Sequence, residues 1–187
     1  MNEPAIQAAL LKTIVAAVSL SQHAAAVAGE AQWWASRLGA SLVFRISNDA
    51  FLVREMSTVM LEASSGSRAL LSALRLVSGA VLAVFGPGMR SVMTGLVTGA
   101  IRGTGIYVEA SPARTYFCTC YGNVGLSAAD GTKKDVIATN HTAHYIHAKA
   151  DAGGPIFAAP LLNHSNQELA MLEKLAGRKP RLKTDAN

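Results

Sequence analysis

The feature that most constrains this chain is a series of short β-prone runs separated by glycine-containing breaks. The runs begin after Gly39 and follow one another roughly every 8–12 residues, with breaks at Gly79 and at Gly86–Gly88. Asp130 and Gly131 stand between two alternating runs, which predicts a hairpin. Many short strands joined by tight turns indicate an all-β sandwich, barrel or solenoid-like sheet.

One element near the C-terminus has a helical period instead. Ser165 is a candidate N-cap, and Glu168 follows three residues later, which is the spacing of a capping box. The leucines of this run fall three positions apart, at Leu169, Leu172 and Leu175. Gly177 then fits the position just past a helix end. We therefore predict a short C-terminal helix whose leucine face packs on the sheet.

Length and composition favour one globular domain with a sizeable core. The chain has 187 residues, of which 50% are hydrophobic and 16% are charged, so it does not have the composition of a disordered chain. Its net charge of +5 depends on a basic cluster near the C-terminus. The cluster consists of Arg178, Lys179, Arg181 and Lys183. We interpret it as a solvated tail and expect no nucleic-acid partner, although a grip on phosphate or anionic lipid stays open.

The N-terminal segment has the order of a secretory signal. Lys12 precedes the apolar run Thr13–Ala28, and a run of small residues follows. The apolar run is shorter than the roughly 20 residues that a membrane-spanning helix needs, and Gln22 and His23 interrupt it. We expect export by a signal peptide to the periplasm or envelope. A retained Ala-rich helix is the alternative.

A second apolar stretch, Leu70–Val97, has the hydrophobicity of a membrane hairpin. Arg75, Arg90 and the Gly-Pro-Gly break argue against a span, so we expect no transmembrane segment. The predicted organisation is a signal-like or helical segment over residues 1–38, a β domain over 39–178 and a basic tail over 179–187.

The only two cysteines lie in the stretch "TYFCTCYG", inside a predicted strand. Alternate residues of a strand share a face, so Cys118 and Cys120 point the same way and Tyr121 points the opposite way. The two Cβ atoms of a regular strand would lie roughly 6–7 Å apart, whereas a disulfide needs about 3.8 Å. A regular strand therefore precludes a disulfide, and only a bulge or turn would permit one.

A Cys-x-Cys pair can also offer two thiolates to a soft metal such as zinc or copper. Further ligands would come from histidines, and His141 and His144 are the candidates closest to the pair in sequence, with His147 and His164 further along. The simpler interpretation, which we prefer, is that the cysteines pack as small apolar side chains and the histidines line a polar edge. We therefore expect no cofactor, with zinc or copper as the alternative. No nucleophile elbow, phosphate loop or dinucleotide motif is present, so we expect no enzyme.

The stretch "IRGTGIYVEA" (Ile101–Ala110) resembles the signature of FecR-like domains, and the resemblance covers about Ser41 to Arg178. Its specific parts are the core Arg102, Gly103 and Thr104, and the segment in which Tyr121 and Gly122 follow the cysteines. Positive φ angles or close backbone approach are expected at Gly103 and Gly105. Arg102 is expected to be buried and paired with a carboxylate, either that of Glu109 or one of a partner, and a ligand-binding arginine is the alternative.

The resemblance implies a mainly β fold: a FecR-like β-sandwich or solenoid-like sheet, with an Ala-rich N-terminal helical segment and a short C-terminal helix. It also implies a non-enzymatic binding or signalling module of the bacterial envelope that recognises a protein or a cell-envelope component. The chain departs from the family pattern at Gly95, where the family has proline, and at Ala100, where it has glycine. The alternative function is a metal- or redox-responsive protein that uses the Cys-x-Cys pair with the nearby histidines.

Overall fold

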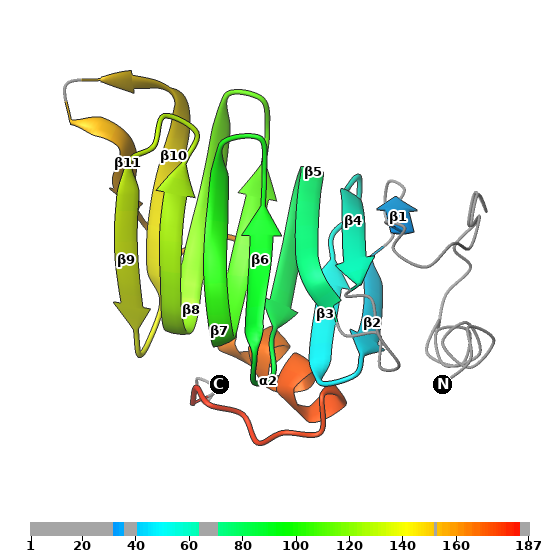
Figure 1. Cartoon of the computed structure of the whole chain (residues 1–187). Helices are drawn as coiled ribbons and strands as arrows, with labels where there is room; N and C mark the ends of the chain where they lie inside the picture. The colour runs from blue at the N-terminus through cyan, green and yellow to red at the C-terminus, as the bar shows by residue number, and fades with distance from the viewer. Residues whose placement is uncertain (1–31, 36–40, 64–70, 152, 184–187) are drawn as a thin grey trace.

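The computed structural model describes residues 32–35, 41–63, 71–151 and 153–183. These residues form eleven strands and one helix, so the predicted mainly β class is confirmed (Figure 1). Among them, no helix is long and apolar enough to cross a membrane. The signal-like run Thr13–Ala28 lies outside the described residues.

All the strands belong to one mixed sheet. The strands are β1 (Gln32–Ala35), β2 (Leu42–Ile46), β3 (Asp49–Val53), β4 (Thr58–Ala63), β5 (Leu71–Val84), β6 (Met89–Met93), β7 (Val97–Ala110), β8 (Arg114–Ala128), β9 (Lys133–Ala138), β10 (Thr142–Asp151) and β11 (Gly154–Ala159). The main path through the sheet is β1-β4-β5-β6-β7-β8-β10-β11, and only β5 and β6 pair in parallel. Because β1 pairs with β4, the sheet starts before the predicted boundary at residue 39.

Three long strands fold this sheet into two layers. The C-terminal parts of β5 and β7 and the N-terminal part of β8 pair with one another and with β3 and β10, and β2 and β11 complete this layer. The other parts of the same three strands pair with β4, β6 and β9, and β1 completes the second layer. We call the first the helix-side layer, because the helix packs on it, and the second the open layer. Figure 1 shows β4, β6 and β9 of the open layer in front and the helix at the lower end of the sheet.

Each long strand changes layer at a glycine. The φ angles are +84° at Gly79 in β5, +60° at Gly103 in β7 and +92° at Gly122 in β8. This left-handed region strains any residue that carries a Cβ atom, which explains why glycine occupies the crossings. At Gly79 a Cβ atom would also lie 2.2 Å from Ser57 Oγ.

The folded sheet has two separate hydrophobic cores. The interlayer core lies between the two layers and contains residues of nearly every strand, among them Phe44, Phe51, Leu74, Leu76, Val81, Phe85, Val92, Ile101, Ile106, Val108, Phe117 and Val124. The helix-side core lies on the outer face of the helix-side layer. It contains Ala50, Leu52, Ala80, Leu82, Val84, Tyr107, Tyr116, Cys118, Cys120, Tyr121, Ala143, Leu169, Leu172 and Ala176.

The helix α2 (Asn166–Leu175) covers the helix-side core. It has the predicted capping box: the Glu168 backbone N–H donates to the Ser165 hydroxyl, and the Glu168 carboxylate accepts from the Ser165 backbone N–H. Leu169 and Leu172 are buried, and Gly177 has a φ angle of +76°. The predictions of the helix, its cap and its packing face are therefore confirmed.

Candidate metal centre

The cysteines lie on the helix side of β8 and are fully buried. Opposite them, Gly105 pairs with Tyr121 and Ile106 pairs with Thr119, so Cys120 has no counterpart in β7. This extra residue is a β-bulge, which re-aims the side chains around it. Tyr121 therefore joins the cysteines in the helix-side core, and the prediction that it points to the opposite face is wrong.

Two loops bring histidines to this bulge. His141 directly precedes β10 with a φ angle of +41°, and its backbone N–H donates to the Cys120 carbonyl at 2.9 Å. His164 lies between β11 and α2, one residue before the N-cap, and its ring stacks on Tyr107 with 4.5 Å between centroids. One ligand atom from each of the two cysteines and two histidines lies within 4.8 Å of all the others. Both cysteines are free thiols.

Three short contacts link the four side chains of this group. Cys118 Sγ lies 3.6 Å from His141 Nδ1, and Cys120 Sγ lies 3.4 Å from His164 Nε2. The two ring nitrogens are 3.2 Å apart. Zinc bonds of about 2.3 Å to sulfur and about 2.0–2.1 Å to nitrogen at tetrahedral angles place neighbouring ligand atoms about 3.3–3.8 Å apart. The two sulfur-to-nitrogen distances fall in this range and the nitrogen-to-nitrogen distance lies just below it, so the four side chains are close enough to share one ion.

The outer nitrogen of each imidazole is already hydrogen-bonded. His141 Nε2 lies 2.7 Å from the Asn166 side-chain oxygen, and His164 Nδ1 lies 2.6 Å from the Leu162 carbonyl. Both oxygens only accept, so the outer nitrogens carry protons, and in a neutral imidazole the inner nitrogen then presents its lone pair. Two lone pairs that face each other at 3.2 Å repel unless a proton or a cation lies between them. Metal-binding histidines in proteins commonly have this arrangement of outer hydrogen bonds.

The two thiols share their ionisation. The hydrogen bond from Cys120 lowers the pKa of the Cys118 thiol to about 4, although burial acts in the opposite direction. Burial, together with the neighbouring Cys118, raises the pKa of the Cys120 thiol well above its ordinary value. The ionisation of the two thiols is therefore coupled, and Cys118 is the thiol that loses its proton more readily. A thiolate is the form of cysteine that binds a metal ion.

His144, the predicted fourth ligand, lies outside this group, and His164 takes its place. His144 pairs with Phe117 across β10 and β8, so its side chain is on the interlayer side of the sheet, where it is buried. Cys118, Cys120 and His141 do come together. The cysteines are packed among apolar side chains, but the preferred interpretation that places the histidines along a polar edge does not describe His141 and His164.

The stretch Arg102–Gly105, on which the sequence resemblance rests, lies beside the bulge. Gly103 has the expected positive φ, and a Cβ atom on Gly105 would lie 2.5 Å from the Tyr121 ring, so both glycine predictions are confirmed. The Thr104 hydroxyl is buried, 3.1 Å from the Arg102 carbonyl and 3.2 Å from that of Asn123.

Arg102 is exposed, so its predicted buried position is wrong. Its expected partner Glu109 instead accepts hydrogen bonds from Tyr107 and Asn163. Arg102 points outward because the buried positions of this stretch belong to its strand neighbours Ile101 and Thr104.

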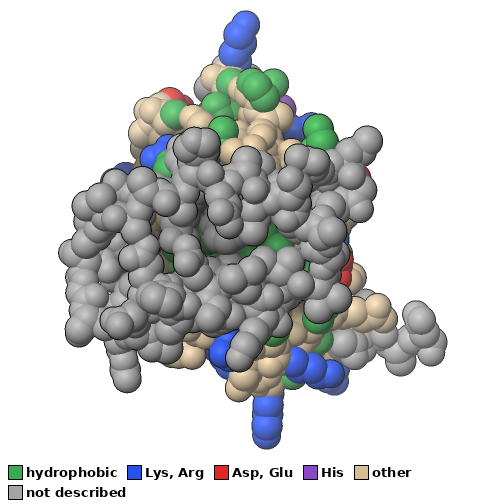
Figure 2. All heavy atoms as spheres, turned by 90° about the vertical axis from the view of Figure 1, so that its right-hand side faces the viewer, with side chains coloured by type: hydrophobic (Ala, Val, Ile, Leu, Met, Phe, Trp, Pro, Cys, Tyr) green, Lys and Arg blue, Asp and Glu red, His purple; other side chains and the backbone are tan. Residues whose placement is uncertain are grey.

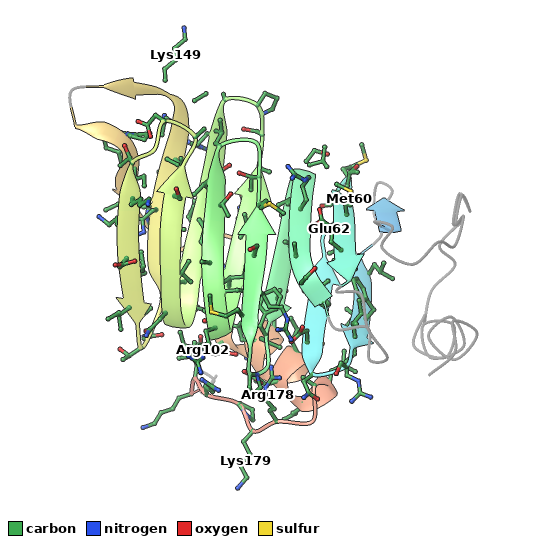
Figure 3. All side chains as sticks on the ribbon, viewed as in Figure 1. Met60, Glu62, Arg102, Lys149, Arg178 and Lys179 are labelled. Atoms are coloured by element: carbon green, nitrogen blue, oxygen red, sulfur yellow. The ribbon has the colours of Figure 1, made fainter. Side chains whose placement is uncertain are left out.

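The described part of the basic tail contacts β7 and β8 near the bulge. Arg181 donates to the Gly103 carbonyl at 3.2 Å, and its guanidinium lies 5.3 Å from the centre of the Tyr121 ring. Figure 2 shows Lys and Arg side chains at the lower end of the molecule, and Figure 3 places Arg102, Arg178 and Lys179 there. The first residues beyond position 178 therefore lie against the domain.

Comparisons with known proteins give a likeness of fold. No family model and no curated protein matches the chain. Two crystal structures of a candidate anti-sigma factor from Parabacteroides distasonis are similar to it, each with 9% sequence identity. The structure at 2.50 Å resolution has a TM-score of 0.54, and the matched region covers 84% of this chain and 82% of the chain in that structure. The structure at 1.65 Å resolution has a TM-score of 0.53, and the matched region covers 78% of this chain and 75% of the chain in that structure. At this identity the likeness concerns the fold alone.

Proposed function

We propose that this protein is a non-enzymatic regulatory module of the bacterial envelope that binds one zinc ion. Its ligands are Cys118, Cys120, His141 and His164. The observation that carries the proposal is the convergence of four buried or half-buried side chains, whose ligand atoms lie within 4.8 Å of one another and whose outer imidazole nitrogens are hydrogen-bonded. The FecR-like motif, and a fold shared with candidate anti-sigma factors, support a role in signalling.

The ligand set suits zinc in a closed site. Two sulfurs and two nitrogens in tetrahedral arrangement are typical of structural zinc sites, and cuprous copper is the soft competitor. Four protein ligands leave no open position for a substrate, in contrast to catalytic zinc sites, which keep one. We therefore assign the ion a role in shape and sensing. Its chemistry is to neutralise the buried thiolate charge and to fix the two loops that carry the histidines.

The test is metal content combined with a spectroscopic signature. We expect one zinc ion per chain by elemental analysis after native purification. Replacement of zinc by Co²⁺ should give the visible absorption of a tetrahedral ion and a sulfur-to-metal charge-transfer band. The variant Cys118→Ser/Cys120→Ser should lose both signals. His147→Gln, which removes an exposed histidine outside the group, should keep them. A wild-type protein without bound metal, or a double variant with unchanged metal content, would overturn the proposal.

The location and the partner are separate parts of the proposal. We propose export by the signal-like run Thr13–Ala28 and recognition of a protein or cell-envelope component, as the resemblance implies. Sequencing the N-terminus of the protein recovered from a periplasmic fraction tests export. An intact Met1 in protein confined to the cytoplasmic fraction would contradict it.

A further inference from the structure

We infer that the ion latches the C-terminal segment, residues 160–183, onto the helix-side layer, so that metal occupancy sets how firmly α2 is docked. The inference rests on the metal site proposed above and adds a regulatory consequence to it. It follows from where the ligands lie in the chain and from what else holds this segment.

The ligands come from both sides of the contact between segment and sheet. Cys118 and Cys120 belong to β8, inside the helix-side layer. His164 belongs to the segment and stands one residue before the N-cap of α2. An ion shared by these residues would connect the first turn of the helix to the centre of the sheet through coordinate bonds.

A second connection runs through the other imidazole. His141 directly precedes β10, and its outer nitrogen lies 2.7 Å from the side-chain oxygen of Asn166, the first residue of α2. The Asn166 amide then donates to the Lys183 carbonyl at 2.8 Å. An ion that orients the His141 ring would therefore also orient the start of the helix and the end of the described tail.

Other contacts also hold the segment on the sheet. Hydrogen bonds run from Tyr116 to the Pro160 carbonyl, from Arg54 to the Asn163 carbonyl, from Tyr121 to the Glu173 carboxylate and from Arg178 to the Asn48 carbonyl. The helix buries Leu169 and Leu172, with Ala176 just beyond its end. A half-buried ion pair joins Arg54 to Glu168 at 2.8 Å, and pairs of this kind contribute little, about 0–1 kcal/mol. A helix of ten residues is also too short to be stable by itself. The bonds to the ion would therefore reinforce these contacts at the start of the helix.

Hydrogen exchange tests the latch on the wild-type protein. We expect the amides of α2 to exchange about tenfold more slowly in zinc-loaded protein than in chelator-treated protein. The amides of β7 in the centre of the sheet should show no such difference. This contrast separates local docking of the helix from stabilisation of the whole fold.

Two variants with three ligands each sharpen the test. Cys118→Ser removes a ligand of the sheet, so saturating zinc should still protect α2. His164→Gln removes the ligand of the segment, so saturating zinc should bind through the remaining three and no longer protect the helix fully. Co²⁺ absorption verifies loading in both variants.

The outcomes distinguish the latch from the site. Loaded wild-type protein with unchanged exchange in α2 would refute the latch and leave the metal site intact. Equal slowing in α2 and β7 would also refute it, because the ion would then stabilise the fold as a whole. Absence of metal binding would remove both proposals.

Discussion

The interlayer core and the helix-side core differ in chemistry although they share the same sheet. The interlayer core consists of aliphatic and aromatic side chains, with Phe51 stacked on Phe44 and edge-on to Phe85. The helix-side core combines small aliphatic residues with tyrosines and both cysteines, and His164 stacks on one of these tyrosines. The first core is closed by two layers that are parts of the same strands, whereas a ten-residue helix and its flanks close the second.

This difference indicates which of the two cores can open without unfolding the sheet. Opening the interlayer core requires separating strands that are continuous through both layers. Opening the helix-side core requires only that one short segment leaves the sheet. Both cysteines and three buried tyrosines lie under this segment. Short elements of low local stability are the ones that open most easily.

The largest effect is expected from truncation in the interlayer core. Phe51→Ala should lower the free energy of unfolding by about 3–5 kcal/mol, because the side chain is fully buried and its removal leaves a cavity. The loss should be the same with and without zinc. Denaturant titration of both forms measures it, and a loss that depends on zinc would show that the two cores are not independent.

Substitution of a glycine at which a strand changes layer should lower the stability nearly as much as Phe51→Ala. Gly79→Ala places a Cβ atom 2.5 Å from the Ser57 Cα atom at a positive φ, so we expect a loss of about 3 kcal/mol or more in thermal unfolding. Gly131→Ala is the matched control, since Gly131 has a φ angle of +90° and nothing within 4 Å of the added atom. Its cost should be about 1 kcal/mol. Equal losses would mean that the clash with Ser57 is relieved at little cost.

Truncation in the helix-side core should act on the metal site. Leu172→Ala removes a fully buried contact of α2 and should lower the zinc affinity about tenfold, because docking and binding are coupled reciprocally. Met171→Ala, the exposed neighbour on the same helix, should leave the affinity unchanged. Competition titration with a chromophoric chelator measures both. An unchanged zinc affinity in Leu172→Ala would contradict the coupling between helix docking and zinc binding.

The smallest effect is expected at the ion pair that borders the helix-side core. Burial of Glu168 opposes ionisation, but the hydrogen bond and charge of Arg54 outweigh it and lower the pKa of Glu168. A lowered pKa in the folded protein stabilises the fold above the unfolded pKa of about 4.3, and this stabilisation is lost as the pH falls through the lowered value.

Arg54→Gln should therefore destabilise the protein by about 0.5–1 kcal/mol at neutral pH, and by less at an acidic pH below the lowered pKa of Glu168. Lys149→Gln, which removes an exposed charge on β10 (Figure 3), is the control and should change stability little at either pH. Chemical denaturation at the two pH values measures both variants. A difference that stays constant with pH would contradict the role of the ion pair.

Local patterns in the sequence predicted the local elements well. The capping box at Ser165 and Glu168 and the turn at Asp130 and Gly131 depend on neighbours a few residues away, so the sequence was enough to locate the helix and the hairpin. Strand alternation failed at Tyr121, because the bulge at Cys120 arises from pairing with β7.

The sequence predicted only part of the candidate site, because one of its histidines comes from a distant part of the chain. Cys118, Cys120 and His141 do come together, but His144 was expected where His164 lies. The prediction used proximity in sequence, whereas the fold of the C-terminal segment back onto β8 brings His164 in from 44 residues away. The available signal was the position of His164 directly before a strong N-cap, since a helix start that packs on the sheet also brings the residue before it there.

The three crossing glycines have a consequence for how the chain could be divided. Since β5, β7 and β8 each contribute to both layers, no single cut in the polypeptide yields one complete layer. A fragment that ends at Gly103 would carry half of each layer and expose both halves. Within the part of the chain that the structure describes, the two layers therefore form a single cooperative unit.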